Sequence, residues 1–467
     1  MPVLMSTKSP TLLTLLQKQG IFIDAACGGR GRCGRCRVLI KGVSKPPDDI
    51  EKVLIPAPLI KKGYRLACRY QTDKIPQSLK LPVPKIRRYK RRRDLGMAID
   101  IGTTVLKGAV VDLEKGSILK VAKTYNPQQA FGGDVISRVD FANNGNYELL
   151  RRSLQRGIDA LKINLGHSNP NFTVIVGNPV MISFYLGKSV KNFGQFPFEG
   201  EIRKGIYLKN PPGYIFGCIG GFVGGDTLAG LFASGLLDRE KPALYIDLGT
   251  NGEIALVMEK RIYVISTAAG PAFEGVGLSS GVLAIPGAID RVVYYKNGFK
   301  ISTIGNKKPK GFCASGYIDL IAQLLKCGLL SEYGKLTKEL EIAGFKITRL
   351  DIRKLQLAIG AIHTGVKFLI DYAGITSGEI KNAVITGEFG AHLTLDALKQ
   401  VGMVPTTLEN LQMEKDLPLR GAVKLLLNEI TPEETETVRE IAVHLELALQ
   451  KDFQRRFLEG LFLKPWN

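Results

Sequence analysis

The sequence predicts a mixed α/β protein with a small N-terminal domain followed by a larger, two-lobed domain. Three observations carry this prediction. Four of the seven cysteines fall between residues 27 and 68. A unit of apolar strand, Asp-x-Gly-Thr turn and second apolar strand occurs at 97–116 and again at 243–260. A third segment, 382–393, combines an apolar strand with a Gly-x-x-Gly turn. The repeated unit indicates an internal duplication, and hence two lobes of similar design.

The composition is that of a folded protein with a large net positive charge. Its 467 residues suit about two to four domains, and a content of 45% hydrophobic and 23% charged residues excludes disorder by composition. The net charge of +21 fits an acidic protein partner, an anionic surface or nucleic acid. The sharpest basic run, 85–94, is more typical of a solvated linker, and no nucleic-acid-binding motif accompanies it. Nucleic acid is therefore not expected as a partner.

The N-terminal sequence gives no sign of export or membrane insertion. It lacks the basic stretch of a signal peptide. No run of about eighteen uninterrupted apolar residues occurs in the chain. The odd number of cysteines also argues against a disulfide framework. We therefore expect a cytoplasmic protein without membrane association.

The clustered cysteines have the spacing C-x5-C-x2-C, and a fourth follows after a further 31 residues. Four converging thiolates can hold a [2Fe–2S] cluster if the loop backbone wraps around it. Such wrapping needs positive φ and close backbone approach, which glycine permits. The candidate ligands are Cys27, Cys33, Cys36 and Cys68, and the loop glycines are Gly28, Gly29, Gly31 and Gly34. A structural zinc site is the alternative, although zinc ribbons usually have two C-x2-C pairs.

This cysteine pattern resembles that of the plant-type ferredoxins, and especially their adrenodoxin-like relatives, which have one more residue in the first gap. The resemblance implies a [2Fe–2S] ferredoxin domain of the β-grasp fold over 1–84. A helix is expected over 11–20, with strands over 35–42 and 64–70. A basic linker is expected over 85–96. Three further cysteines are expected to be small buried side chains: Cys218, Cys313 and Cys327.

The repeated strand–turn–strand unit has the chemistry of a phosphate clamp. Glycine lets backbone amides approach phosphate oxygens, and threonine or asparagine adds donors. An ionised aspartate cannot donate to phosphate and instead suits Mg²⁺ or the orientation of an attacking water. The turn residues in these roles are Gly102, Thr103, Thr104, Gly249, Thr250, Asn251 and Gly252. The candidate catalytic carboxylates are Asp100, Asp247 and Glu253. Asp226, flanked by glycine in an apolar segment, needs a partner and is expected to face the nucleotide or the metal.

Together these motifs resemble the ASKHA superfamily, which includes acetate and sugar kinases, Hsp70 and actin. The resemblance covers residues 97–400 and implies two ribonuclease-H-like lobes, 97–242 and 243–467, the second with C-terminal helices and a strand. It implies ATP in the cleft between the lobes. Gly270 is expected at the nucleotide, and the turn containing Gly387 and Gly390 is expected against the nucleoside. Glu388 stands in that turn at a position where the superfamily usually has glycine.

The segments between the motifs, among them 126–141, 266–290 and 351–370, narrow the family. With the N-terminal cysteine motif, they make nearly the whole chain similar to the reductive activators of corrinoid proteins. The resemblance implies an ATP-hydrolysing iron–sulfur reductase that passes one electron from the [2Fe–2S] cluster to Co(II) and regenerates Co(I). It also implies a corrinoid protein as partner, an external low-potential electron donor and a homodimer. The positive charge of this chain suggests that the partner has an acidic surface.

Two other classes of function fit parts of the sequence. A small-molecule kinase of the ASKHA type with an attached redox sensor would use the hairpins, but phosphoryl transfer gives the cluster no role. A non-catalytic, nucleotide-switched redox or assembly protein is the other class, and an actin-like or chaperone-like assembly protein would need no redox-active iron. The activators of 2-hydroxyacyl-CoA dehydratases are related electron pumps. Their cluster bridges two subunits, however, and they have no fused ferredoxin domain.

A few residues have a structural as well as a functional interpretation. Asp134 either contributes to the site or caps a helix. Glu253 could also be an exposed hairpin carboxylate. His363 lies on an amphipathic helix and is expected to be packed rather than catalytic. The loop with Ser279 and Ser280 is either a partner-facing loop or, more simply, an ordinary turn between lobes.

Overall fold

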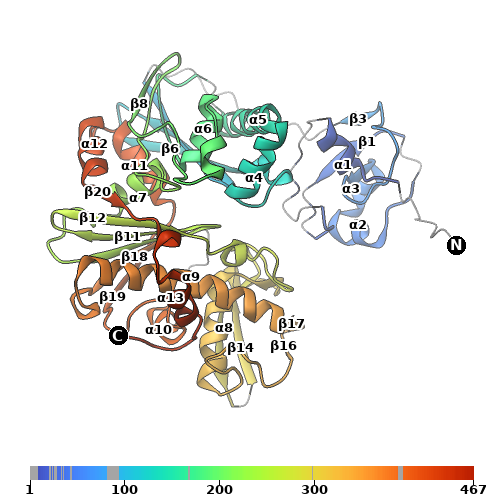
Figure 1. The fold of residues 1–467 in the computed structure, drawn as a ribbon. Helices are drawn as coiled ribbons and strands as arrows, with labels where there is room; N and C mark the ends of the chain where they lie inside the picture. The colour runs from blue at the N-terminus through green and yellow to red at the C-terminus, as the bar shows by residue number, and fades with distance from the viewer. Residues whose placement is uncertain are drawn as a thin grey trace.

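The computed structural model describes residues 9–19, 23, 25, 29–32, 34, 36–42, 45–80, 94–166, 169–296, 298–387 and 393–467. Figure 1 shows a small N-terminal unit and two larger sheets with their helices. The predicted basic linker lies largely outside the described residues, except that its last two positions already belong to β4, which begins at Leu95. No helix in the described ranges is long and apolar enough to cross a membrane.

The N-terminal unit has a three-stranded antiparallel sheet in the order β2-β1-β3. Its elements are α1 (Leu12–Lys18), β1 (Arg37–Ile40), α2 (Asp49–Leu54), α3 (Ala57–Lys61), β2 (Tyr64–Leu66) and β3 (Leu79–Lys80). The side chain of Thr11 caps α1 by accepting from Thr14 N at 3.2 Å. The predicted helix and both predicted strands are thus present.

The first large sheet has the order β6-β5-β4-β7-β9-β8. Its strands are β4 (Leu95–Ile101), β5 (Val105–Asp112), β6 (Ser117–Tyr125), β7 (Phe172–Gly177), β8 (Ile206–Lys209) and β9 (Pro212–Ile215). β4 is fully buried and pairs antiparallel with β5 and parallel with β7. A run buried at every position is typical of a central strand covered on both faces. One face packs against α4 (Val135–Phe141), α5 (Tyr147–Leu165) and α6 (Pro179–Leu186).

The second large sheet repeats this plan, with the order β19-β18-β10-β11-β12-β20. Its strands are β10 (Ala243–Leu248), β11 (Gly252–Met258), β12 (Arg261–Thr267), β18 (Asn382–Gly387), β19 (Asn410–Met413) and β20 (Ala442–His444). β10 pairs antiparallel with β11 and parallel with β18, as β4 does with β5 and β7. The internal duplication predicted from the two Asp-x-Gly-Thr units is confirmed in this topology.

Two helices lie between the sheets, namely α7 (Gly225–Ser234) and α11 (Leu417–Leu426). Their apolar residues share one core with side chains from both sheets, and Figure 1 shows them at the left of the view, between the upper and the lower lobe. α11 contacts β4, β5 and β7, so the chain returns to the first sheet after β19. α12 (Pro432–Ile441) then contacts α7 and leads into β20. The two lobes are therefore joined through packed helices.

The outer face of the second sheet is covered by α9 (Arg349–Ala373), which begins at a Thr348–Asp351 capping box and ends at Gly374 in the left-handed conformation. α13 (Phe453–Gly460) packs on α9. A neighbouring group consists of β13 (Ala288–Tyr295), β14 (Gly298–Thr303), β15 (Gly311–Phe312), α8 (Ala314–Lys326), β16 (Leu340–Ile342), β17 (Phe345–Ile347) and α10 (Leu395–Gln400). This group shares the large core of the second lobe.

Candidate functional site

The first hairpin turn joins β4 to β5 and carries the Gly-Thr-Thr sequence. A Cβ at Gly102 would lie 2.5 Å from the carbonyl oxygen of Val105, so the turn requires glycine. Asp100, two residues before it, is only 6% exposed. In the antiparallel register it lies opposite Lys107. The hairpin therefore brings a buried carboxylate, a lysine and the turn amides to one end of β4.

Buried amide side chains hold this turn from behind. Asn126 donates from Nδ2 to the carbonyl of Gly102 at 2.9 Å, and its backbone N–H donates to the carbonyl of Thr104 at 2.9 Å. Asn178 donates from Nδ2 to Oγ1 of Thr103 at 3.0 Å. Because these contacts engage the carbonyls and one hydroxyl of the turn, they fix its conformation. Asn126 lies in the segment 126–141 but carries no motif that predicts a role for it from sequence.

We expect Asn126→Ala to weaken nucleotide binding by about tenfold, the size expected from losing a buried hydrogen-bonding side chain. The turn would then sample conformations that bind phosphate less well. Equilibrium binding of a fluorescent ATP analogue measures the change, and a thermal melt verifies folding. Asn144→Ala is the matched control, because Asn144 is exposed and donates only to the carbonyl of Asp140. Equal affinity in wild type and Asn126→Ala would show that the turn needs no such support.

The second hairpin turn joins β10 to β11 and meets the first. The backbone N–H of Gly249 donates to the carbonyl of Asn251 at 3.0 Å, which closes the turn. Thr250 Oγ1 lies 3.1 Å from Thr104 Oγ1, across 146 residues of sequence. Gly252 begins β11, where a Cβ would clash with the side chain of Ile362. The two threonine hydroxyls thus mark the point where both lobes contribute donors to one place.

Carboxyl groups gather beside the two turns. Burial raises the pKa of Asp100 to about 8; Lys107 opposes that rise, while Asp226 and Asp247 add to it. Burial likewise raises the pKa of Asp226 to about 7, with a further contribution from Asp247. The pKa of Glu253 is raised well above its usual value by burial and then by Asp226 and Asp247. Glu253 lies opposite Asp247 in the strand register. The prediction that Glu253 could be an exposed hairpin carboxylate is therefore wrong.

This arrangement fits a cation that is shared with a phosphate ligand. The raised pKa values mean that burial, and then the neighbouring carboxylates, disfavour the ionised forms, a cost that a bound divalent cation would offset. Within the described residues, however, no three His, Cys, Asp or Glu side chains converge closely enough to bind a metal by themselves. Mg²⁺ usually binds one or two carboxylates and completes its shell with waters and substrate phosphates. The donor set suits that mode better than a site formed by protein side chains alone.

Three charged residues of the site were not identified from the sequence. Lys107 forms an ion pair with Asp416, with Nζ 2.6 Å from Oδ1. Glu274, which is 9% exposed, accepts from Thr250 Oγ1 at 3.0 Å and from Thr104 Oγ1 at 3.2 Å. Arg138 is fully buried, and its Nη2 has no hydrogen-bond partner in the part of the chain that the structure describes. Burial lowers the pKa of Arg138 to about 9. A charged residue in an apolar or glycine-rich segment was the available signal for Lys107 and Glu274.

The residues expected at the nucleoside are only partly described. Gly387 ends β18 with φ 138° and pairs with Leu248, next to the second turn. Gly270 has φ 73° and precedes the short 3-10 helix η4 (Pro271–Glu274). Gly390 and Glu388 lie outside the described residues. The structure therefore brings Gly387 to the hairpin end of the sheet and leaves the rest of that turn untested.

The cysteine site can be followed at two of its four predicted ligands. Cys36 is 1% and Cys68 5% exposed. The backbone N–H of Ala67 donates to the carbonyl of Cys36 at 2.9 Å, which places the two cysteine segments side by side. Cys27 and Cys33 lie outside the described residues. The loop glycines that are described have positive φ, at Gly29 (81°), Gly31 (70°) and Gly34 (65°).

The loop backbone also lies close to Cys68. A Cβ at Gly29 would lie 3.8 Å from Cβ of Cys68 and 3.1 Å from Cδ2 of Leu13. The distance to Cys68 is an ordinary van der Waals contact, whereas the left-handed φ of Gly29 and the close approach to Leu13 favour glycine at this position. Two buried thiols and a loop in the left-handed conformation that the motif requires fit a [2Fe–2S] cluster.

Several residues for which a structural role was expected are found in such a role, although Cys327 is less buried than predicted. Asp134 caps α4 by accepting from Ser137 N at 2.8 Å. His363 is buried on α9, where Nδ1 lies 2.7 Å from the carbonyl oxygen of Gly402 and the ring packs against Trp466. Cys218 and Cys313 are buried, whereas Cys327 is half-buried. The backbone N–H of Ser279 donates to Asp351 at the start of α9 at 2.7 Å.

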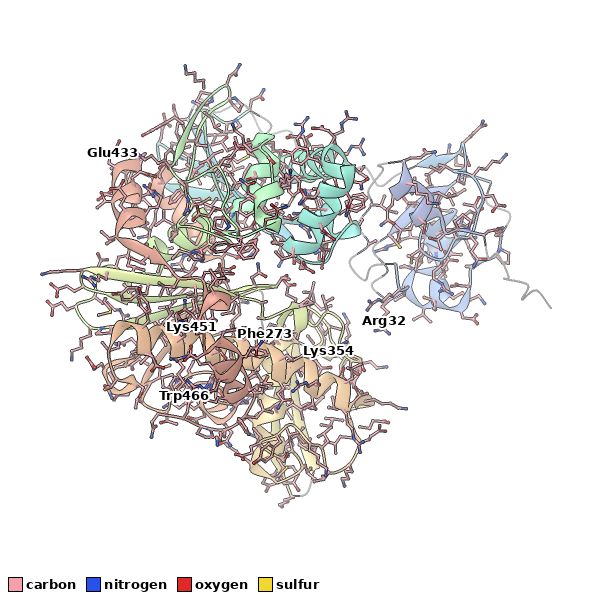
Figure 2. All side chains as sticks on the ribbon, in the orientation of Figure 1. Arg32, Phe273, Lys354, Glu433, Lys451 and Trp466 are labelled. Carbon is pink, nitrogen blue, oxygen red and sulfur yellow. The ribbon has the colours of Figure 1, made fainter. Side chains whose placement is uncertain are left out.

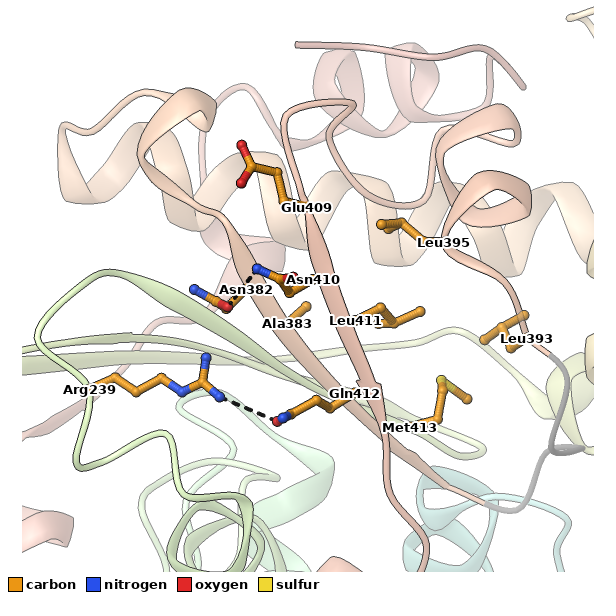
Figure 3. A pocket seen from close by; sticks show the side chains of 10 residues that line it. All are labelled: Arg239, Asn382, Ala383, Leu393, Leu395, Glu409, Asn410, Leu411, Gln412 and Met413. Atoms are coloured by element: carbon orange, nitrogen blue, oxygen red, sulfur yellow. Dashed lines mark hydrogen bonds between the residues drawn. The ribbon is translucent and has the colours of Figure 1, made fainter.

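A cavity of about 570 Å³ lies away from the hairpins. Figure 3 shows it against β18 and the edge strand β19, with Arg239 donating to Gln412 and Asn410 donating to Asn382. Its walls contain none of the predicted phosphate-binding or carboxylate residues. We therefore assign it no part in the site.

Comparisons with known proteins agree with this arrangement. A family model described as the C-terminal domain of RACo, the ASKHA domain, matches residues 241–467, and one described as the RACo middle region matches 95–239. A model of the 2Fe-2S iron-sulfur cluster binding domain matches residues 5–72. The solved structure of a reductive activator for corrinoid,iron-sulfur protein superposes with a TM-score of 0.73 and 25% identity, covering 98% of this chain and 96% of that one.

A curated relative decides the family. The corrinoid activation enzyme RamQ of Eubacterium limosum is 33% identical over 425 residues, which cover 79% of this chain and 70% of that protein. This chain belongs to the family of reductive activators of corrinoid proteins. The activator is also 27% identical over 415 residues to the [Co(II) methylated amine-specific corrinoid protein] reductase of Methanosarcina barkeri, covering 78% and 76% of the two chains. The predicted family and fold class, a β-grasp ferredoxin domain followed by a two-lobed ASKHA domain, are confirmed.

Proposed function

We propose that this activator uses ATP to return a corrinoid protein from the Co(II) to the Co(I) state, with one electron carried by its [2Fe–2S] cluster. The observation that carries the proposal is the meeting of two duplicated hairpins, with Thr104 and Thr250 3.1 Å apart, in a chain that also has a ferredoxin domain. A kinase would need the hairpins but no cluster, and a ferredoxin would need the cluster but no hairpins. Only a protein that couples the use of ATP to electron transfer needs both the hairpins and the cluster.

The hairpins would hold ATP through the groups that the two turns supply. The backbone amides and hydroxyls of the turns suit the phosphate oxygens. The proposed phosphate-binding residues are Gly102, Thr103, Thr104, Gly249, Thr250, Asn251 and Gly252. Gly270, Gly387 and Gly390 would contact the nucleoside side. Mg²⁺, when bound, supplies positive charge at the phosphates, and Asp100, Asp226 and Asp247 are the residues that would hold it, directly or through water. Glu253, opposite Asp247, would orient the attacking water.

The cluster domain would hold its irons through Cys27, Cys33, Cys36 and Cys68. Cys36 and Cys68 are held side by side by the Ala67–Cys36 backbone hydrogen bond. The glycine loop admits the backbone to the thiols without a side chain between them. A plant-type cluster has a reduction potential of about −400 mV and supplies one electron at a time.

Nucleotide binding can drive the electron transfer only if the lobes respond to it. For one electron, a thousandfold shift in equilibrium corresponds to about 180 mV, or about 4 kcal/mol. A ligand that prefers one arrangement of two lobes by that amount could supply it. α7 contacts both sheets, α11 contacts the first sheet and α7, and the apolar residues of both helices share one core with the two sheets, so these helices are the elements that a change of cleft closure would move. The surface of the activator that the corrinoid protein recognises would then depend on the nucleotide.

The partner, the assembly and the location complete the proposal. The charge of +21 supports a corrinoid protein with an acidic docking surface. An external low-potential donor must reload the cluster after each electron. A homodimer is the assembly that the family resemblance suggests. An odd cysteine count supports a reducing, cytoplasmic compartment.

Anaerobic absorbance of a corrinoid protein tests the proposal. A Co(II) partner mixed with reduced activator and Mg·ATP is expected to develop the Co(I) spectrum, and omission of ATP is expected to slow or abolish it. Addition of a polyol or a carboxylate should leave the rate of ATP consumption unchanged, whereas a kinase given its substrate would consume ATP faster. Formation of Co(I) at the same rate without nucleotide would overturn the ATP-driven function.

A further inference from the structure

Glu274 occupies the place where the two hairpins meet. Its Oε2 accepts from the hydroxyl of Thr104, which belongs to the first lobe, and from that of Thr250, which belongs to the second. The donor–acceptor distances are 3.2 and 3.0 Å. The residue lies 170 positions from Thr104 in sequence and ends the short helix η4. One carboxylate oxygen therefore links the phosphate-binding turns of both lobes.

A count of protons decides what these contacts mean. The two hydroxyls also lie 3.1 Å from each other, so there are three short contacts but only two hydroxyl protons. Hydrogen bonds to a carboxylate are stronger than those between neutral hydroxyls. With Glu274 ionised, both protons therefore point to its carboxylate. A hydroxyl that donates to Glu274 cannot at the same time donate to a phosphate oxygen, so a phosphate in this position must compete with the carboxylate.

A buried cation acts on Glu274 electrostatically. The guanidinium of Arg138 and the carboxylate of Glu274 attract each other, and this attraction, after the larger one to Asp134, partly offsets the fall in the pKa of Arg138 caused by burial. An ionised Glu274 presents the hydroxyls of Thr104 and Thr250 with an oxygen that carries negative charge, as a phosphate oxygen does.

The segment that carries Glu274 leads to a separate part of the second lobe. Gly270 and Gly275, on either side of η4, have φ of 73° and 72°, which a residue with a side chain rarely adopts. Beyond them, the carbonyl of Gly277 accepts from Nζ of Lys354 at 2.5 Å, and Ser279 N–H donates to Asp351. Figure 2 labels Phe273, next to Glu274, and Lys354 on α9, which contacts this segment at Gly277.

We propose that Glu274 is an intramolecular competitor of the nucleotide: its carboxylate takes the place of a phosphate oxygen on Thr104 and Thr250, and ATP must displace it. This inference rests on the proposed binding of ATP by the two hairpins. Displacement moves η4, and the segment 275–281 passes that movement to the start of α9. Glu274 thereby converts occupation of the cleft into a change at a loop outside it.

Nucleotide affinity tests the competition, because its expected direction is opposite to that of a supporting role. Glu274→Ala is expected to bind a fluorescent ATP analogue about tenfold more tightly, the size of one charge-assisted hydrogen bond no longer opposed. Glu274→Gln keeps the shape without the charge and should fall between wild type and Glu274→Ala. Glu339→Ala, which removes an exposed carboxylate of the same lobe, is the control and should bind as wild type.

Amide hydrogen exchange tests the transmission without relying on affinity. Binding of the ATP analogue to wild type is expected to increase exchange in 271–282, and this response should be lost in Glu274→Ala. If wild type binds no nucleotide, the proposed function fails. If wild type binds it and folded Glu274→Ala binds it equally or more weakly, the hairpins are a nucleotide site and Glu274 is not its competitor. An unaltered exchange response in Glu274→Ala would overturn the transmission step.

Discussion

Cys68→Ser is expected to reduce Co(I) formation to the rate seen without the activator, while nucleotide binding stays unchanged. The Cys68 thiol is buried, and the glycine loop runs close beside it. A serine hydroxyl does not ionise near neutral pH and is a poor substitute for a thiolate on iron, so the cluster should be lost or labile. The hairpins belong to other sheets, so the loss should not reach them. Iron content, the paramagnetic signal of the reduced protein and ATP-analogue binding measure the three parts separately.

Cys327→Ser provides the matched control for this variant. Cys327 is half-buried at the end of α8, and its thiol contacts only the carbonyl of Leu324 among the atoms that the structure describes, at 3.6 Å. The variant should retain full iron and full activity. A Cys68→Ser protein with wild-type iron content and wild-type Co(I) formation would remove Cys68 from the ligand set and require a different fourth ligand for the cluster.

The sequence was informative where the function depends on local pattern. The two Asp-x-Gly-Thr turns each require a glycine, an aspartate and two apolar strands within twenty residues, so the motif is visible without knowledge of the fold. The same holds for the cysteine loop and for Asp134, whose capping partner is Ser137, three residues away. These features are determined by neighbours in sequence, and their positions were predicted from sequence alone.

Features that depend on long-range packing were not predictable in this way. Glu274 becomes meaningful only because two turns 146 residues apart bring their threonines together at its carboxylate. Lys107 stands out in the sequence only as a charged residue in an apolar strand, and its partner Asp416, at the start of α11, is distant in sequence. The return of α11 to the first sheet likewise has no local signature. A division of the chain by sequence at 242/243 therefore assigns α11 to the second lobe, although α11 contacts the sheet of the first lobe.

Asp100→Asn is expected to lower ATP hydrolysis by about a hundredfold or more, because it removes a carboxylate placed to act on Mg²⁺ or on the attacking water. The same change is expected to stabilise the protein in the absence of nucleotide and Mg²⁺. Asp100 is buried, and its pKa is raised to about 8 by burial and by the neighbouring carboxylates. Asparagine has nearly the same shape and carries no charge, so the cost of the buried charge disappears. Activity and stability should thus move in opposite directions.

The pH dependence of stability has a defined sign. The carboxyl of Asp100 binds its proton more tightly in the folded state than in the unfolded state, where the pKa is about 3.9. Folding is therefore increasingly penalised as the pH rises above about 4, and the penalty stops growing above about 8. The stability advantage of Asp100→Asn over wild type, measured by denaturant unfolding in EDTA, should grow across that window. Asp140→Asn, at an exposed position on α4, should alter neither activity nor stability.

Combining the two measurements separates three roles for Asp100. A purely structural carboxylate would lower activity only through lost stability, so Asp100→Asn would be both less stable and less active. A carboxylate with no part in the reaction would leave hydrolysis unchanged whatever its effect on folding. If Asp100→Asn is more stable but hydrolyses ATP more slowly, the wild-type carboxylate serves the reaction and lowers the stability of the fold. Such a charge is the one expected where a bound cation compensates it during turnover.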